Sequence, residues 1–342
     1  MAFSAHSHQL LPTTTPAPPP TPSNQSHQLS ATPDALSCLF LRLPPTLSLP
    51  TRRRPSQLNT AATLPVISLK ENPSLHDNLV SQLGFFQLTD HHVPSQLADA
   101  AELEAQSLFL RRDTSHNLSW PHGYDDEEDE YGESFCFDPT APDTSSLTSL
   151  GEFAVALEGV GFEVVEALSE AAGFENPFKE KSKARRLLWV SKCGGDGITP
   201  HYSGRLYPYV VALQYQMRKH KVSLLGDSAW VSVDPEAASI LVTIGDVAQV
   251  WSNGKLKKVR GRPLVNHGEE SESSSISVTL LLSLPLESVV SPLPLAADKK
   301  VENRDEEASE DDKFATFSFE DYAWRVYHER LPLKDTLDRY RI

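Results

Sequence analysis

The chain has 342 residues, 39% of them hydrophobic, which is enough to build a sizeable core in one large domain or two ordinary ones. Its net charge of -15 argues against a protein that coats nucleic acid, because neutralising phosphates requires clustered Lys and Arg. No apolar run approaches the roughly 20 residues of a membrane-spanning helix, and the cysteines are few and scattered, so we expect neither a membrane protein nor a disulfide framework.

Residues 1–63 differ in composition from the rest. They are rich in Ser, Thr and Pro and hold one acid, Asp34, against four arginines, so this segment is +3 and the remainder is -18 (-15 minus 3). A segment of this composition buries too little apolar surface to fold, and we expect it to be disordered. Acid-poor, Ser-rich, Arg-bearing segments are typical of transit peptides, and the Ser, Thr and Pro content favours the plastid. We therefore predict a chloroplast transit peptide and a place in the plastid stroma; the alternatives are an ordinary disordered tail and a cytoplasmic protein.

The next region, residues 64–175, is predicted to contain strands followed by helices. The short apolar run 64–69 and the aromatic run 84–94, which ends in a proline, both favour strands. Residues 95–110 follow with a pattern typical of a helix.

Residues 147–171 carry the clearest periodicity in the chain. Apolar side chains recur there every three to four positions, which predicts an amphipathic helix with one buried stripe. The six consecutive acids at 125–130 predict a solvated loop rather than a metal site.

Residues 176–290 change to short β-type runs separated by turn residues. Two of these runs, 230–233 and 240–244, are predicted to be paired strands. The run that begins at Ser275 alternates small polar and apolar residues, so Ser275 and Ser277 are expected on one face, directed into a pocket. Several short strands at this spacing favour a jelly-roll, or double-stranded β-helix, core.

The last part of the chain is predicted to be an acidic loop, residues 291–315, followed by a C-terminal region, 316–342, whose helix runs from Phe319 to about Leu331. Helices first, strands after and one closing helix describe an α+β domain.

Four segments, in this order along the chain, resemble plant 2-oxoglutarate/Fe(II) dioxygenases, the group of gibberellin oxidases and flavonoid-modifying enzymes. Residues 64–69 are similar to their Pro-Val-Ile-Asp-Leu, and residues 84–94 to their Gly-Phe-Phe-Gln-Val-Thr-Asn-His-Gly-Val-Pro. Residues 244–255 are similar to their Asn-Ile-Gly-Asp and Trp-Ser-Asn-Gly-Lys motifs, and residues 319–337 to their closing helix. The resemblance implies an isopenicillin N synthase-like fold.

The resemblance also implies where a cofactor site would lie. The family holds Fe(II) with two His and one carboxylate, and it anchors 2-oxoglutarate with a Tyr and with an Arg that a Ser follows two residues later. The corresponding positions hold Tyr207, Tyr209 and Gly261 for the metal, and Val190, Ser275 and Ser277 for 2-oxoglutarate. Trp189 and Arg262, beside these positions, are possible pocket-lining residues.

On this alignment the Ser277 hydroxyl is the one cofactor-contacting group that remains. We therefore predict a degenerate member that needs no cofactor, a pseudoenzyme that binds a small molecule or a protein partner, not nucleic acid or a membrane, and is a monomer. The alternative is a divergent oxidoreductase that hydroxylates or desaturates a small plant metabolite with Fe(II) and 2-oxoglutarate, using a site rebuilt from His201, His220 or His267. A third possibility is a sequence error near 193–210 or 260–275.

Overall fold

The computed structural model describes nine stretches of the chain, residues 60–70, 83–110, 134–193, 207–226, 229–261, 263–266, 275–294, 312–328 and 335–342. All of them belong to one compact unit, Gln57–Ile342; a second unit, Met1–Ser56, lies outside the described residues. Of the predicted transit peptide, 1–63, only residues 60–63 are described, and the six acids at 125–130 lie outside the described residues. Of the predicted acidic loop, 291–315, only residues 291–294 and 312–315 are described.

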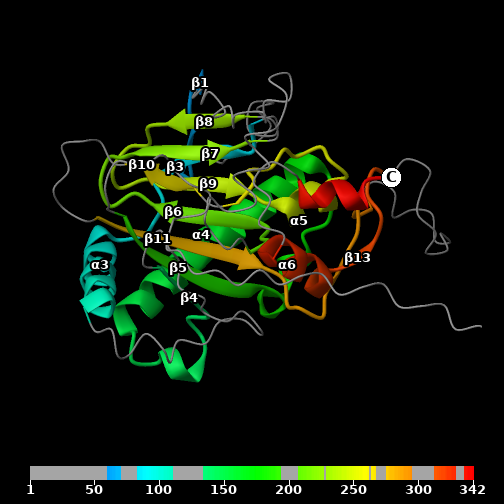
Figure 1. Cartoon of the computed structure of the whole chain (residues 1–342). Coiled ribbons are helices and arrows are strands. Elements are labelled where there is room, and N and C mark those ends of the chain that lie inside the picture. Colours follow the sequence, from blue (N-terminus) through cyan, green and yellow to red (C-terminus); the bar gives the residue numbers. More distant parts are fainter. Residues whose placement is uncertain are drawn as a thin grey trace, which may run out of the picture. The chain divides into compact units, whose positions relative to one another are not determined.

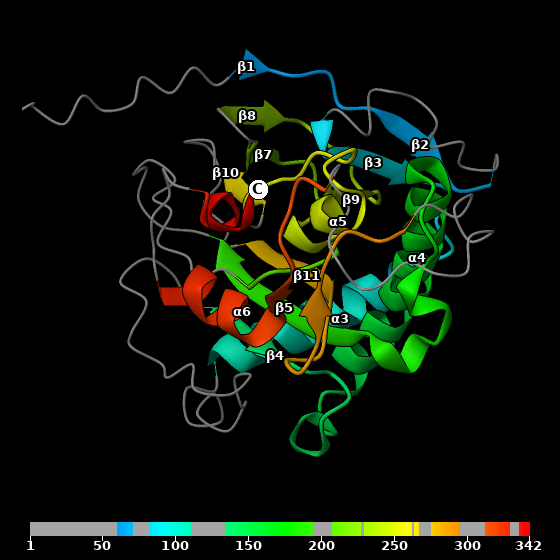
Figure 2. The same ribbon diagram turned by 90° about the vertical axis from the view of Figure 1, so that its right-hand side faces the viewer.

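The largest sheet has seven strands in the order β2-β3-β9-β6-β11-β5-β4. Figure 1 labels the strands from β3 to β4 in this order, and Figure 2 labels β2 beside β3. Their bounds are Val66–Ser68 for β2, Phe85–Thr89 for β3, Ser134–Phe137 for β4, Arg185–Cys193 for β5, Val211–Tyr215 for β6, Ile240–Ile244 for β9 and Ser275–Ser283 for β11. All neighbours pair antiparallel except β2 and β3. The strand predicted over 84–94 is shorter than expected, because Asp90 takes a positive φ of 53° and ends the extended backbone.

A second sheet has four strands in the order β1-β8-β7-β10. Their bounds are Thr60–Ala61 for β1, Lys221–Leu225 for β7, Trp230–Val233 for β8 and Leu264–Asn266 for β10. β1 belongs to the segment for which no structure was expected, and it pairs with β8. The predicted pairing of 230–233 with 240–244 is wrong: β8 pairs with β7, whereas β9 pairs with β3 and β6. The chain changes sheets between them, at a connection where Ala238 has a φ of 56°.

Two helices cover one face of the seven-stranded sheet (Figure 2). The predictions over 95–110 and 147–171 are confirmed by α3, Ser95–Leu110, and α4, Thr148–Ala172. Gly161 lies where α4 meets the sheet, and a Cβ there would come within 2.6 Å of Leu282 Cδ1 and 3.1 Å of Leu213 Cδ1. Leu213 and Leu282 therefore mark the helix face of β6 and β11.

The opposite face of this sheet is turned toward the four-stranded sheet. Phe85 and Leu241 extend from it into a buried cluster with Val222 and Leu224 of β7 and Val233 of β8. Because strand residues alternate between faces, every position that shares a face with Leu241 lies on the side of the sheet opposite α3 and α4, which we call the interior face. The fold is an α+β jelly roll, as the sequence indicated.

The C-terminal region lies against this core. α6, Phe319–His328, buries Phe319 and Tyr322 and follows β13, Phe317–Ser318, which pairs with β12, Val289–Val290. A short 3₁₀ turn, Thr336–Tyr340, closes the chain and was not predicted. No helix among the residues described could span a bilayer.

Candidate functional site

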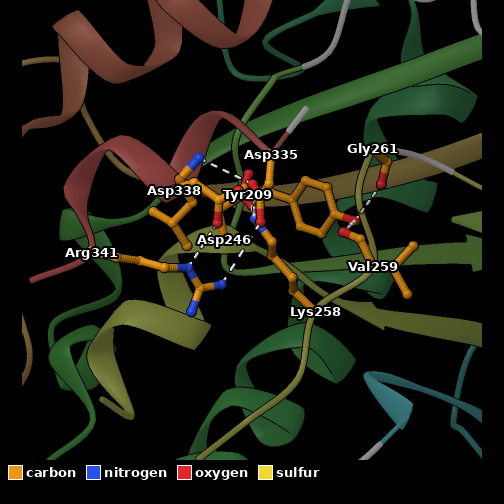
Figure 3. A network of polar contacts seen from close by, with 9 residues as sticks. Tyr209, Asp246, Lys258, Val259, Gly261, Asp335, Asp338 and Arg341 are labelled. Atoms are coloured by element: carbon orange, nitrogen blue, oxygen red, sulfur yellow. Dashed lines mark hydrogen bonds and ion pairs between the residues drawn. The ribbon is translucent and has the colours of Figure 1, made fainter. Parts of the chain in front are cut away.

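Tyr209 and Gly261, two of the three predicted metal positions, are in direct contact (Figure 3). Tyr209 lies just before β6, and its Oη donates a hydrogen bond of 2.6 Å to the carbonyl oxygen of Gly261. The same Oη lies 3.2 Å from Thr243 Oγ1, on the interior face of β9. Since Tyr209 is only 3% exposed, its ring is buried beside Gly261.

The backbone around Tyr209 is packed tightly enough to hold the ring in place. Gly245 lies against it, and a Cβ on Gly245 would come within 2.1 Å of the Tyr209 carbonyl oxygen. Only a glycine fits there, which gives a physical reason for the Gly in the Ile244-Gly245-Asp246 motif.

Tyr207, the third metal position, has different neighbours. Its ring packs edge-on against Phe319 of α6, with 6.1 Å between the ring centroids. Burial is the main cause that raises the pKa of Tyr207 to about 12, and the nearby Arg185 guanidinium opposes that rise. Tyr207 is therefore a neutral phenol at neutral pH.

The 2-oxoglutarate positions on β5 and β11 divide between the two faces of the sheet. Ser277 pairs with Ser191, and Val190 pairs with Val278. Because Ser277 is an odd position of β11 and Leu282 an even one, Ser277 faces the interior and Val190 faces the helices. On β5 the interior positions are Trp189 and Ser191, so the structure does not bring Val190 together with Ser277.

Among the residues that the structure describes, those near Ser277 on the interior face are polar but carry no charge. Gln214 Nε2 donates to Ser277 Oγ at 2.7 Å, and Gln216 Nε2 donates to Gln214 Oε1 at 3.1 Å. Both glutamines are buried. Ser275 pairs with Cys193 at the end of the ladder, one pair beyond Ser277 and Ser191.

The substitute ligands considered from the sequence are only partly within the described structure. Arg262, His201 and His267 lie outside it, whereas His220 is half-buried and directly precedes β7. Within the part of the chain that the structure describes, no group of three or more His, Cys, Asp or Glu could hold a metal ion.

A buried ion network next to Tyr209 was not anticipated. Lys258, 1% exposed, contacts Asp246 at 2.5 Å and Asp335 at 2.7 Å (Figure 3). Burial lowers the pKa of Lys258, but the two carboxylates outweigh it and the net pKa is raised. Burial by itself would raise the pKa of Asp335, but the charge of Lys258 outweighs burial, and the pKa of Asp335 is lowered. Lys258 belongs to the mostly polar stretch 255–258, so the sequence around it gives no signal that it is buried. Of the three residues of the network, only Asp246 lies within the motif recognised over 244–255.

Comparisons with known proteins agree with this architecture. Residues 192–283 match the model of the 2OG-Fe(II) oxygenase superfamily. A 1-aminocyclopropane-1-carboxylate oxidase homolog from Solanum lycopersicum is 24% identical, with 88% of this chain and 90% of that protein covered. A gibberellin 2-beta-dioxygenase from Phaseolus coccineus is 25% identical over 68% of this chain and 80% of that protein.

The fold is also that of a solved structure, a dioxygenase for auxin oxidation from rice. It superposes with a TM-score of 0.61 at 20% identity, covering 82% of this chain and 100% of that one. The motif order, the match of residues 192–283 to the superfamily model and the jelly-roll topology agree, and together they support membership of the plant 2-oxoglutarate/Fe(II)-dependent dioxygenase superfamily.

Proposed function

We propose that this chain is a non-catalytic member of the superfamily, which keeps the jelly roll and binds a small molecule or a protein partner. The observation that carries the proposal is the hydrogen bond between Tyr209 Oη and the Gly261 carbonyl oxygen. At the place where the resemblance expects ionisable ligands, the chain holds a neutral phenol bonded to its own backbone.

The residues at the three metal positions do not fit Fe(II). Gly261 has no side chain, and the Tyr209 hydroxyl hydrogen is already donated to a carbonyl. With a pKa of about 12, Tyr207 would be ionised in roughly one molecule in 10⁵ at pH 7. A protonated phenol is a poor ligand compared with imidazole or carboxylate.

The 2-oxoglutarate positions support the same proposal. A dicarboxylate needs a cation at its distal end, and Arg serves this role best through a bidentate pair. Ser277, Ser191 and Gln214 offer only neutral hydrogen-bonding groups on the interior face. We infer that this face suits a neutral ligand or a packed core better than a dianion.

Two measurements on the purified full chain test the proposal. The first is anaerobic equilibrium dialysis against Fe(II), with bound iron quantified; the second is formation of succinate from 2-oxoglutarate under oxygen. We expect substoichiometric iron and no succinate above the protein-free control. One iron per chain together with succinate formation would overturn the proposal.

The alternative, a divergent oxidoreductase of a small plant metabolite, is favoured by the superfamily membership itself and by relatives named as oxidases and dioxygenases. It predicts that iron binds and that His201→Ala or His267→Ala abolishes that binding. His220→Ala should weaken the binding likewise, because His220 is the third candidate ligand. His91→Ala is the matched control, because His91 is not a candidate ligand and its Nε2 lies 2.9 Å from the Ala238 carbonyl oxygen.

A further inference from the structure

A pocket of about 300 Å³ opens where β5 begins and β11 ends. Its apolar part consists of Ala184, Pro285 and Leu286. Four charged residues complete the lining, Asp138, Arg185, Arg186 and Glu287. A volume of this size accommodates a small metabolite.

Two of the four charges are already engaged by the protein. Arg186 forms an ion pair of 2.7 Å with Glu158 and also donates to the Lys181 carbonyl oxygen. Asp138 Oδ1 accepts from Thr140 N at 2.8 Å and from Thr140 Oγ1 at 2.6 Å. These contacts fix both groups within the wall of the pocket.

Arg185 and Glu287 are the two charges that remain available to a ligand. Among the residues that the structure describes, no ion pair neutralises either charge. The Arg185 guanidinium hydrogen-bonds to the neutral Tyr207 hydroxyl, which leaves its charge and its other N–H groups to a ligand, and Glu287 is exposed. Both residues line the same pocket. The pocket therefore presents one cation, Arg185, and one anion, Glu287, beside a small apolar surface.

We propose that this pocket binds a small zwitterion of the amino-acid type, with its carboxylate on Arg185, its ammonium group on Glu287 and its apolar side chain on Pro285 and Leu286. A simple anion would meet repulsion from Glu287, and a simple cation would meet repulsion from Arg185. Only a ligand that carries both charges is attracted to both ends. The pocket is separate from the Tyr209–Gly261 contact, so the proposal holds whether or not the chain has catalytic activity.

Isothermal titration calorimetry of the full chain, in EDTA to exclude iron, tests the proposal with three matched probes. These are L-leucine, its carboxylate-only analogue 4-methylpentanoate and its amine-only analogue 3-methylbutylamine. We expect L-leucine to bind at least ten-fold more tightly than either analogue. Equal binding of 4-methylpentanoate, or no binding of L-leucine to the folded protein, would overturn the assignment.

Variants locate the binding. Arg185→Gln and Glu287→Gln should each weaken L-leucine binding at least ten-fold, whereas Lys183→Gln, which removes an exposed cation paired with Glu180, should not change it. Circular dichroism and thermal unfolding confirm that each variant is folded. If both pocket variants bind L-leucine as the unaltered chain does, the ligand binds elsewhere and the proposal is wrong. Since no step involves iron, this outcome is independent of the test for catalysis.

Discussion

Replacing Lys258 with Met should destabilise the fold strongly. The substitution keeps the length of the side chain but removes an ammonium group that is 1% exposed and lies 2.5 Å from Asp246 and 2.7 Å from Asp335. It leaves Asp246, whose side chain is only 16% exposed, without its cation, and it leaves Asp335, 14% exposed, with only the Arg341 guanidinium at 4.0 Å. Removing one partner from a buried ion network costs about 3–5 kcal/mol. This is a large part of the roughly 5–15 kcal/mol that stabilises a typical domain.

Urea unfolding at pH 7, followed by circular dichroism, measures this loss. Lys219→Met is the matched control, because Lys219 pairs with Glu236 at 3.4 Å with both side chains more than half exposed. Such a surface pair contributes at most about 1 kcal/mol. If Lys258→Met loses no more free energy of unfolding than Lys219→Met, the buried network does not stabilise the fold and this reasoning fails.

The pH dependence gives a second check on the same network. The pKa of Asp335 is lowered in the folded chain, so its contribution is present above the unfolded value near 3.8 and is lost as pH falls through the folded pKa. The pKa of Lys258 is raised, so its contribution is present below the unfolded value of 10.5 and is lost as pH rises through the folded pKa. Between these limits the unaltered chain should keep this stability. Acidification toward pH 4 should narrow its advantage over Lys258→Met, because protonation removes the uncompensated carboxylate charges.

Three further predictions follow from the described contacts and the composition. Tyr209→Phe should lower the free energy of unfolding by about 1–2 kcal/mol, because it leaves the part-buried Gly261 carbonyl oxygen without its donor. Tyr340→Phe is the control, and equal losses in urea unfolding would contradict a special role for Tyr209. Gly161→Val should cost about 1–3 kcal/mol by overpacking α4 against the sheet. At Gly159 a Cβ would have no neighbour within 4 Å outside its own stretch of helix, so Gly159→Val should cost clearly less, as thermal unfolding would show. Residues 1–63 fused to a fluorescent protein should direct it to plastids in leaf protoplasts; a diffuse cytoplasmic signal would refute the transit-peptide hypothesis.

Local patterns were sufficient for most helices and strands. The stripe of α4 and the alternation of β11 each depend on side chains within a few residues of one another, which is the range over which helix and strand periods are visible. The short helix α5, Asp246–Trp251, was missed because its six residues are too few to establish a period.

The site was predictable in its positions but not in its contacts. Motif spacing indicated Tyr209 and Gly261 as corresponding positions, yet the hydrogen bond between them joins residues 52 apart in the chain. Nor could the sequence show that Val190 faces the helices, because a shift of one residue in register reverses every side chain of a strand.

The sequence by itself indicated the resemblance to the superfamily, the order of the elements and the chemical identity of the residues at the positions that correspond to the family's cofactor ligands. Tertiary structure alone decided that Tyr209 fills the space beside Gly261, that Lys258 is buried between Asp246 and Asp335, and that Arg185 and Glu287 face one pocket. The physical reason is the range of the interactions. Periodicity and motifs act within short stretches, whereas burial and charge pairing depend on which distant segments the closed jelly roll brings together.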